Sequence, residues 1–260
     1  MQKKRYSYED LLEIMKLLRS PGGCPWDREQ DHESLKKYLI EETYEVLEAI
    51  DLNNPEKLCE ELGDVLLQVV FHARVSEENG RFSMEDVIHS VSSKMVSRHR
   101  HVFGHEQAET AEDVVNLWED IKKEEKGAKT QTLILKDVPS ILPALMRSYK
   151  VQEKAAKVGF DWDHVDDAWK KVIEETGELR EAYKSGDAGK AEEELGDLLF
   201  AVVNVARFLK IQPELALTGT INKFIKRFEY IETKSSEMGR ELSGMTLQEM
   251  DALWEESKKL

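Results

Sequence analysis

An internal repeat is the feature of this chain that most constrains its fold. The segment I-E-E-T-Y-E-V-L-E at residues 40–48 returns 133 positions later as I-E-E-T-G-E-L-R-E, and E-E-L-G-D at 60–64 returns at 193–197. L-W-E-D-I-K-K at 117–123 likewise returns as L-W-E-E-S-K-K at 253–259. Because a long repeated pattern is one structural unit used twice, we predict an N-terminal domain at residues 1–126, a linker at 127–140 and a C-terminal domain at 141–260.

Each repeat has the pattern of α-helices. Hydrophobic residues recur three and four positions apart, which places them on one helix face, and no segment shows the alternation of a strand. The first two stripes are Leu39, Ile40, Thr43, Leu47 and Ile50, then Leu58, Leu62, Val65, Leu66 and Val69. Asn54-Pro55 and Asp187 are typical helix starts. We therefore predict an all-α protein of two tandem helical bundles, each with two acidic helices joined by a short turn and followed by a Lys- and Arg-bearing helix.

Composition excludes several classes of protein. The 52 acidic and 37 basic residues give a formal net charge of −15, which repels phosphate backbones and argues against general nucleic-acid binding. Apolar runs such as 65–70 and 198–203 are far below the roughly 20 residues that span a bilayer, so we expect no membrane segment. Cys24 and Cys59 suit neither a zinc knuckle nor a disulfide framework, and no signal peptide is recognisable. We therefore expect a cytoplasmic protein.

Pairs of carboxylates stand on corresponding helices of both repeats. In the first repeat Glu42 and Glu45 are three residues apart, as are Glu61 and Asp64 on the next helix, so each pair shares a helix face. If the two helices pack antiparallel, the pairs converge, and like charges that close require a cation. Hard oxygen ligands suit Mg²⁺, with Mn²⁺ as a substitute. Glutamate-rich faces are often only solvated surface, but the recurrence of this spacing in both halves favours a shared site.

These motifs resemble a known enzyme family. E-E-x-x-E followed across a turn by E-x-x-D, together with G-G-C-P-W-D-R-E-Q at 22–30 and K-V-G-F-D-W at 157–162, is similar to the MazG-type all-α nucleoside triphosphate pyrophosphohydrolases. The resemblance implies conversion of a nucleoside triphosphate and water to the monophosphate and diphosphate, in nucleotide-pool cleansing or stress-linked control. The Mg²⁺ ligands that it implies are Glu42, Glu45, Glu61 and Asp64 in the first repeat and Glu175, Glu178, Glu194 and Asp197 in the second.

Further charged and aromatic residues recur around the acid motifs. Lys171 and Lys190 each stand one helical turn before a candidate ligand, where an ammonium group can reach a bound phosphate. Lys223 and Arg227 offer further phosphate contacts, and Trp254 can stack on a base. The substrate-binding candidates are Lys171, Lys190, Glu193, Lys223, Arg227 and Trp254, with Lys57, Lys94, Arg98 and Trp118 as N-terminal counterparts.

One residue of each repeat is a candidate for handling the attacking water. Glu174 and its counterpart Glu41 lie beside the implied ligands without being assigned as ligands, so either could orient or deprotonate a water molecule. Glu193 is an equally placed alternative in the second repeat.

Other readings of the same residues are open. A non-catalytic helical scaffold or regulator could bind protein partners through its acidic faces. Di-iron carboxylate bundles use Glu-x-x-His pairs, which neither acid motif contains. His99, His101 and His105 have no counterparts in the second repeat, and we expect packing rather than zinc there. Because a two-helix hairpin cannot bury its apolar face alone, we expect the repeats to pack on each other or on a second chain, most simply in a homodimer.

Overall fold

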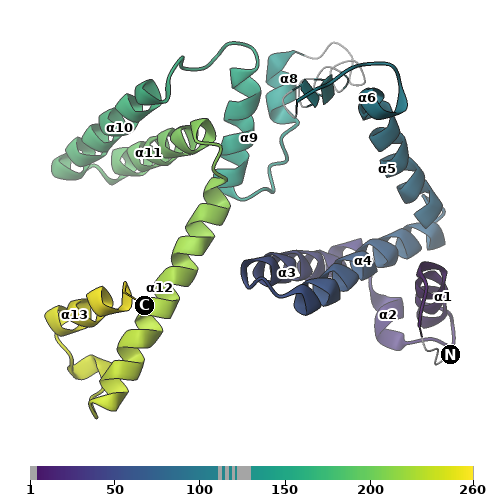
Figure 1. Ribbon diagram of the computed structural model, residues 1–260, viewed down its shortest axis with the longest axis horizontal. Helices are drawn as coiled ribbons and strands as arrows, with labels where there is room; N and C mark the ends of the chain where they lie inside the picture. The colour runs from purple at the N-terminus through teal and green to yellow at the C-terminus, as the bar shows by residue number, and fades with distance from the viewer. Residues whose placement is uncertain (1–4, 111–112, 115–116, 119–120, 122–129, 260) are drawn as a thin grey trace. The chain divides into compact units, whose positions relative to one another are not determined.

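The computed structural model describes residues 5–110, 113–114, 117–118, 121 and 130–259. Two compact units, residues 1–126 and 127–260, divide the chain. Each unit is described by itself. All regular elements in the described residues are helical, which confirms the all-α prediction (Figure 1). None of the described helices is both long and apolar enough to span a bilayer.

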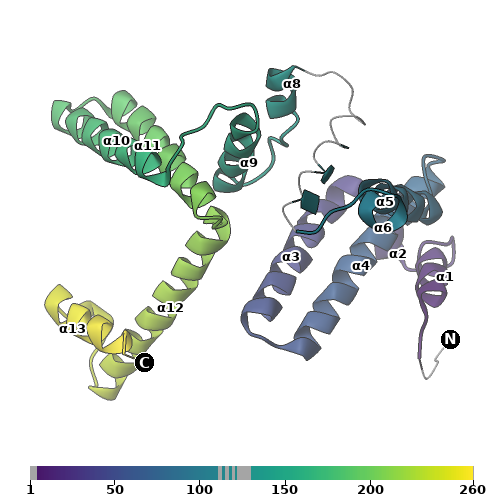
Figure 2. The same cartoon turned by 45° about the horizontal axis from the view of Figure 1, so that its top comes forward.

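The N-terminal unit is built around an antiparallel helix hairpin, α3–α4 (Figure 2). Asn54 begins α4 as predicted: its side chain accepts hydrogen bonds from the amides of Glu56 and Lys57, and Pro55 takes the first helical position. Helix α1 packs on the C-terminal half of α4, which α5 follows. The described helices of this unit are α1 (Tyr8–Leu18), α2 (Pro25–Glu29), α3 (His32–Asp51), α4 (Pro55–Glu78), α5 (Met84–Arg98) and α6 (Arg100–Phe103).

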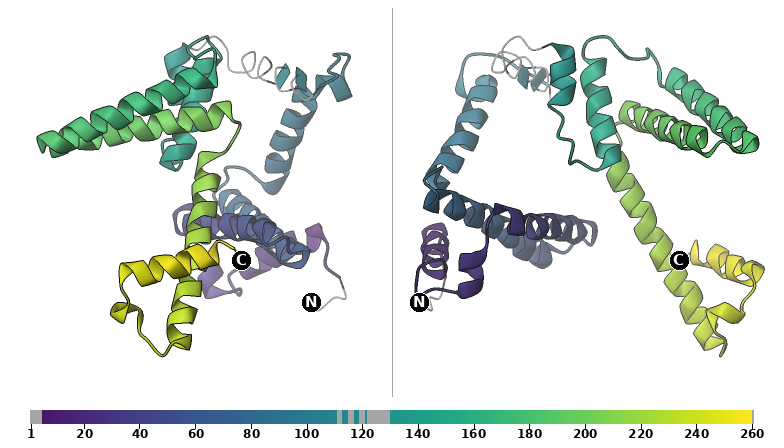
Figure 3. Two further views of the ribbon diagram at one scale, coloured as in Figure 1. Left: turned by 60° about the vertical axis from the view of Figure 1, so that its left-hand side comes forward. Right: turned by 180° about the vertical axis from the view of Figure 1, so that it is seen from behind.

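The C-terminal unit repeats this hairpin as α10–α11. Gly186, whose φ of 73° lies in the left-handed region, ends α10, and Asp187 caps α11 through the amide of Lys190. Helix α13 folds back along α12 (Figure 3). The described helices are α8 (Gln131–Lys136), α9 (Ala144–Ala156), α10 (Val165–Ser185), α11 (Ala188–Phe208), α12 (Pro213–Glu237), the 3₁₀ turn η1 (Leu242–Gly244) and α13 (Leu247–Ser257).

A short helix lies where the sequence predicts a linker. Residues 131–136 form α8, because the Thr130 hydroxyl accepts a hydrogen bond from the amide of Leu133 and starts the helix. Gln131 then donates to the carbonyl of Lys154 at 2.7 Å, which ties α8 to α9. The linker prediction did not include this helix.

The apolar stripes predicted on the hairpin are exposed in part. Leu35 and Ala49 are buried on α3, and Glu42, seven residues or two helical turns from each, lies on the same face toward α4. Ile40 is 57% exposed and Leu62 is 52% exposed, so these two apolar side chains face outward while Glu42 and Glu61 meet across the hairpin. An outward apolar face of this kind is typical of an association surface.

Candidate metal centre

Acidic side chains of α10 and α11 meet across the C-terminal hairpin. Oxygen atoms of Glu175, Glu194 and Asp197 lie within 4.8 Å of one another, and those of Glu175 and Glu178 are equally close within a group that includes Glu174. Glu175 is only 4% exposed and Glu194 8%. We call Glu175, Glu178, Glu194 and Asp197 the C-terminal cluster. All four implied ligands are therefore brought together.

Lys171 neutralises part of this charge from one turn away on α10. Its Nζ lies 2.5 Å from Oε1 of Glu175 and 2.9 Å from Oε1 of Glu174, and these contacts raise the pKa of Lys171. The second oxygen of Glu175, Oε2, is buried with no hydrogen-bond partner in the described residues. Leaving a buried carboxylate oxygen unpaired lowers the stability of the folded chain. A cation or a hydrogen-bond donor at this oxygen would restore that stability.

The charge repulsion within the C-terminal cluster is visible at Glu178. The negative charge of Glu194 is the main cause that raises the pKa of Glu178, followed by desolvation and the charge of Glu175. A carboxyl group binds its proton more tightly when its charged form is destabilised. Four carboxyl groups meet here beside one lysine, Lys171, and a divalent cation fits this donor set.

The N-terminal hairpin forms a matching group, which we call the N-terminal cluster: Glu42, Glu45, Glu61 and Asp64. Oxygens of the three glutamates lie within 4.8 Å of one another. Burial raises the pKa of Glu42, with a further contribution from the charge of Asp64. Burial also raises the pKa of Glu61, which shares a hydrogen bond with Glu45. Burial and like charge thus disfavour the ionised forms of Glu42 and Glu61, and a cation held between them would favour those forms.

The two clusters differ in their cations. Tyr38 stands where the C-terminal repeat has Lys171, and its ring packs edge-on against Trp26 with centroids 5.9 Å apart. Lys57 forms an ion pair with Glu48, and this contact raises the pKa of Lys57. The N-terminal cluster therefore lacks the lysine that holds Glu175 in the other hairpin.

If like charge strains the C-terminal cluster, Glu178→Gln raises the melting temperature of the metal-free protein at pH 7.5. Because the folded-state pKa of Glu178 is raised, its ionisation disfavours folding. The gain is present above that raised pKa and fades as the pH falls toward the ordinary value of 4.5, where the wild-type group is protonated too. Thermal melts in EDTA measure the shift. Glu181→Gln, which removes an ion pair with Lys184 outside the cluster, is the control and should give no gain; a lower melting temperature for Glu178→Gln contradicts the prediction.

Three substrate-binding candidates of the second repeat, Lys223, Arg227 and Trp254, lie on helices outside the hairpin α10–α11. Lys223 and Arg227 belong to α12, whose main packing partners are α9 and α13. The guanidinium of Arg227 lies 5.4 Å from the centre of the Trp254 ring, which also packs against Phe224 at 5.1 Å. Within the part of the chain that the structure describes, neither Lys223 nor Arg227 forms an ion pair with the C-terminal cluster, whose lysine contact comes from Lys171. Trp254 is half-buried and borders the small core of α12 and α13.

Their N-terminal counterparts, Lys94, Arg98 and Trp118, also lie outside the hairpin α3–α4. Lys94 and Arg98 lie on α5, whose main packing partners are α4 and α6. Trp118 packs edge-on against His99 at 4.8 Å, and its buried Nε1 has no partner in the described residues. Nδ1 of His99 also donates to the carbonyl oxygen of Met95, 2.6 Å away, so packing is the role that the structure gives this histidine.

Residues beside the acids keep exposed side chains. Glu41, Glu193 and Lys190 are exposed on the hairpins, and Glu174 is held by Lys171. The sequence placed Lys171 near bound phosphate; its contact with Glu175, a candidate ligand, was not foreseen, although the four-residue spacing is a signal for such a pair.

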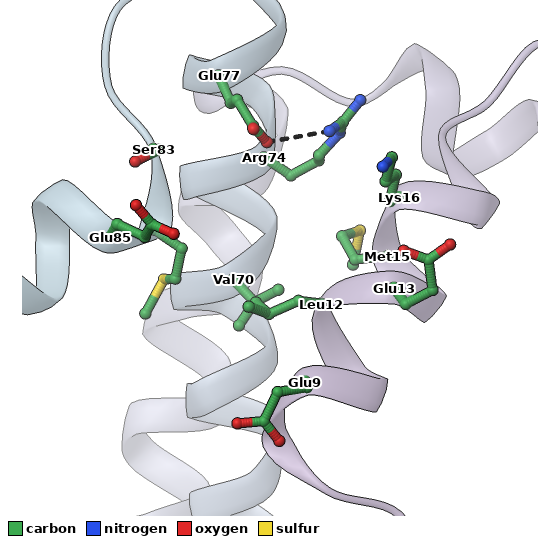
Figure 4. A pocket seen from close by; sticks show the side chains of 11 residues that line it. Glu9, Leu12, Glu13, Met15, Lys16, Val70, Arg74, Glu77, Ser83 and Glu85 are labelled. Atoms are coloured by element: carbon green, nitrogen blue, oxygen red, sulfur yellow. Dashed lines mark hydrogen bonds and ion pairs between the residues drawn. The ribbon is translucent and has the colours of Figure 1, made fainter.

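A separate cavity of about 400 Å³ lies in the N-terminal unit between α1, α4 and the start of α5 (Figure 4). Leu12, Met15 and Val70 line its apolar part, and Glu9 and Glu85 stand at its edge. It contains none of the site residues predicted from the sequence.

Comparison with known proteins identifies the family. The model of the MazG nucleotide pyrophosphohydrolase domain matches residues 30–103 and again 166–231, so each hairpin lies within one match. A Thermotoga maritima nucleoside triphosphate pyrophosphohydrolase/pyrophosphatase MazG is 46% identical over 251 residues, 96% of this chain and 95% of that protein. A nucleoside triphosphate pyrophosphohydrolase of Escherichia coli is 44% identical over 252 residues, covering 96% of both chains. An uncharacterised Bacillus subtilis protein, YabN, is 51% identical over 98% of this chain but 52% of its own length. The chain belongs to the MazG nucleotide pyrophosphohydrolase family.

Proposed function

We propose that the chain hydrolyses nucleoside triphosphates to monophosphates and diphosphate at the two carboxylate clusters, with Mg²⁺ as cofactor and Mn²⁺ as a possible substitute. Family membership makes it a nucleoside triphosphate pyrophosphohydrolase, a hydrolase of acid anhydrides. It also favours the enzyme over a non-catalytic scaffold. The assignment of the reaction to particular residues is the part that we propose.

The observation that carries this assignment is the unpaired buried oxygen of Glu175. Glu175 is one of four carboxylates that meet from two helices, and Lys171 contacts only its other oxygen. A hard divalent cation would satisfy that oxygen and relieve the repulsion between Glu178 and Glu194. Bound there, Mg²⁺ would screen the charge of the triphosphate and lower the pKa of a coordinated water.

The protein's own side chains divide the remaining work. Glu174 stands next to the ligands and is exposed, so it can accept a proton from the attacking water, with Glu193 as the alternative base. Lys190 and Lys223 offer ammonium groups to phosphate oxygens, and Arg227 offers a planar fork. The contact of Arg227 with Trp254 would place a phosphate-binding cation beside an aromatic face on which a base can stack.

Pyrophosphate release from a mixture of the common nucleoside triphosphates tests the function. We expect monophosphate and diphosphate in equal amounts with Mg²⁺ present, and loss of both products in EDTA. Release of nucleoside diphosphate and orthophosphate instead would contradict the reaction, and an unchanged rate in EDTA would contradict the cofactor.

A homodimer is the assembly that the exposed apolar faces support. Ile173 is 71% exposed and its counterpart Ile40 is 57% exposed, both on the hairpin helices. Exposed large apolar side chains on corresponding helices are typical of an interface, and such a hairpin can pair with a second copy of the chain. We also place the protein in the cytoplasm, because both cysteines are free thiols.

Substitution of these residues tests the dimer. We expect the wild-type chain to run at the mass of two 30.0 kDa protomers in light scattering, and Ile173→Glu to raise the dimer dissociation constant by at least about tenfold, since burial of one such side chain contributes about 1.5–3 kcal/mol. Ile141→Glu is the matched control, because Ile141 is 91% exposed outside the hairpin. A monomeric wild type, or equal effects of both substitutions, contradicts the proposal.

A further inference from the structure

The N-terminal hairpin carries a polar stripe that its C-terminal counterpart lacks. Gln68, His72 and Ser76 stand four residues apart on α4 and therefore share one face. Gln68 is 6% exposed and Ser76 is fully buried. The corresponding residues of the second repeat are apolar: Ala201 and Val205 of α11, and Leu209, which follows its last residue. Ala201 and Val205 are buried and Leu209 is exposed, so buried hydrocarbon replaces Gln68 and His72, and no polar group replaces Ser76.

His32 joins this stripe from the first turn of α3. Its Nδ1 lies 2.9 Å from Nδ1 of His72, and the two rings stack with centroids 5.2 Å apart and an interplanar angle of 11°. Its other nitrogen, Nε2, lies 3.1 Å from the hydroxyl of Ser76. The counterpart of His32 at the start of α10 is Val165. Three polar groups therefore connect the start of α3 to the C-terminal half of α4.

The number of protons on the two rings decides whether this connection holds. With both rings neutral, one Nδ1 carries the hydrogen and the other accepts it. A first added proton leaves one N–H and one lone pair between the rings, so the bond survives. A second added proton places N–H groups on both Nδ1 atoms at 2.9 Å and two positive charges on stacked rings. The second protonation therefore breaks the contact.

The surrounding charged groups have partners of their own. Asp31, next to His32, accepts hydrogen bonds from the amides of Glu33 and Ser34. Charged groups on the neighbouring elements include Arg19 after α1, paired with Glu78 of α4, and Arg74 of α4, paired with Glu77. They also include Arg28 of α2, which donates to the carbonyl of Pro21, and Asp86 of α5, which accepts from Ser83. Asp31 is thus the acid adjacent to the pair, and it can stabilise a first proton there.

Burial makes His72 resist protonation in the folded chain. It lowers the pKa of His72, and the neighbouring His32 lowers it further. The unfolded chain takes up protons at the ordinary value of 6.5, so the unfolded state binds more protons below that pH. The stability that this contact contributes is therefore present above about pH 6.5 and is lost as the pH falls.

We propose that His32, His72 and Ser76 form an acid-sensitive latch that closes the N-terminal hairpin, and that the C-terminal hairpin, with Val165, Val205 and Leu209 at these positions, has no such latch. Glu42 and Glu61 lie on the same two helices, so opening the latch loosens the N-terminal cluster. Acidification then acts on one repeat of the chain and leaves the other closed.

Hydrogen exchange of the full-length protein tests the latch. Between pH 7.5 and 5.5, after correction for intrinsic exchange rates, we expect protection at residues 31–36 and 68–79 to fall about three- to tenfold, the worth of one intramolecular hydrogen bond. Residues 165–169 and 201–209 should not change. In the double variant His32→Val, His72→Val, which introduces the C-terminal residues, the pH response should disappear. His89→Asn, which removes an exposed histidine of α5, is the control and should keep it.

Two results would overturn the proposal: equal loss of protection in both hairpins, or an unchanged pH response in the double variant. Because the double variant could fail to fold, nitrogen NMR of the wild-type imidazoles gives a second measurement. We expect the His72 ring to titrate below its ordinary value of 6.5. Titration of His72 at or above that ordinary value would also overturn the proposal.

Discussion

In a chain whose N-terminal cluster carries Asp64→Asn, we expect Glu175→Gln to lower the rate of pyrophosphate release by more than about 100-fold. Loss of a group that merely supports a metal ligand costs about 10- to 100-fold, and Glu175 is itself a proposed ligand at the buried centre of the C-terminal cluster. The Asp64→Asn background removes any contribution of the other site. Steady-state rates at saturating Mg²⁺ measure the effect.

Two further variants make this result specific. Asp197→Asn should have the same effect without disturbing the contact between Lys171 and Glu175. Glu181→Gln, on the same helix but outside the cluster, should leave the rate unchanged. Circular dichroism should show unaltered helicity in all variants, because neutralising one of several like charges does not oppose folding. Near-wild-type turnover in both Glu175→Gln and Asp197→Asn would refute the assignment.

We expect the two repeats to contribute unequally to activity. Disabling the C-terminal cluster with Glu194→Gln and Asp197→Asn should cost about one to two decades of rate, whereas Glu61→Gln and Asp64→Asn should leave most of it. The reason is that Tyr38 replaces Lys171, so the N-terminal site lacks one charge-assisted contact, which changes a rate by this amount if it acts in the transition state.

Lys171→Met supplies the direct test of that reason. In the chain with the N-terminal cluster disabled, it should reduce the rate by the same one to two decades. All variants should be assayed over one panel of nucleoside triphosphates and one range of Mg²⁺ concentration. The charge argument is wrong if the variant that keeps only the N-terminal cluster hydrolyses every substrate at least as fast as the variant that keeps only the C-terminal cluster.

The helices and acid clusters could be predicted because they depend on local spacing. Asn54-Pro55 starts a helix in any context, and residues three apart share a face whatever surrounds them. The convergence of Glu42 with Glu61 required one further assumption, an antiparallel hairpin, which the short turn at residues 52–54 justified. The repeat then supplied the same prediction twice.

What the sequence could not reveal depends on contacts between distant residues. Ile40 belongs to a correctly located apolar stripe, yet periodicity gives no sign that this stripe faces solvent while the acids face the neighbouring helix. The contact of His32 with His72 spans 40 residues and has no counterpart in the second repeat, so self-similarity did not single it out. Helix α8 was missed because its start depends on a single threonine cap.

Binding of Mn²⁺, followed by the loss of its free-ion electron paramagnetic resonance signal, tests most directly whether the carboxylate clusters form metal sites. The measurement needs neither substrate nor turnover. For the full-length chain carrying both Asp64→Asn and Asp197→Asn, we expect affinity for Mn²⁺ to fall by more than about tenfold relative to the wild type, while Glu181→Gln binds as the wild type does. Equal Mn²⁺ binding by the wild type and the doubly substituted chain would contradict the proposed site.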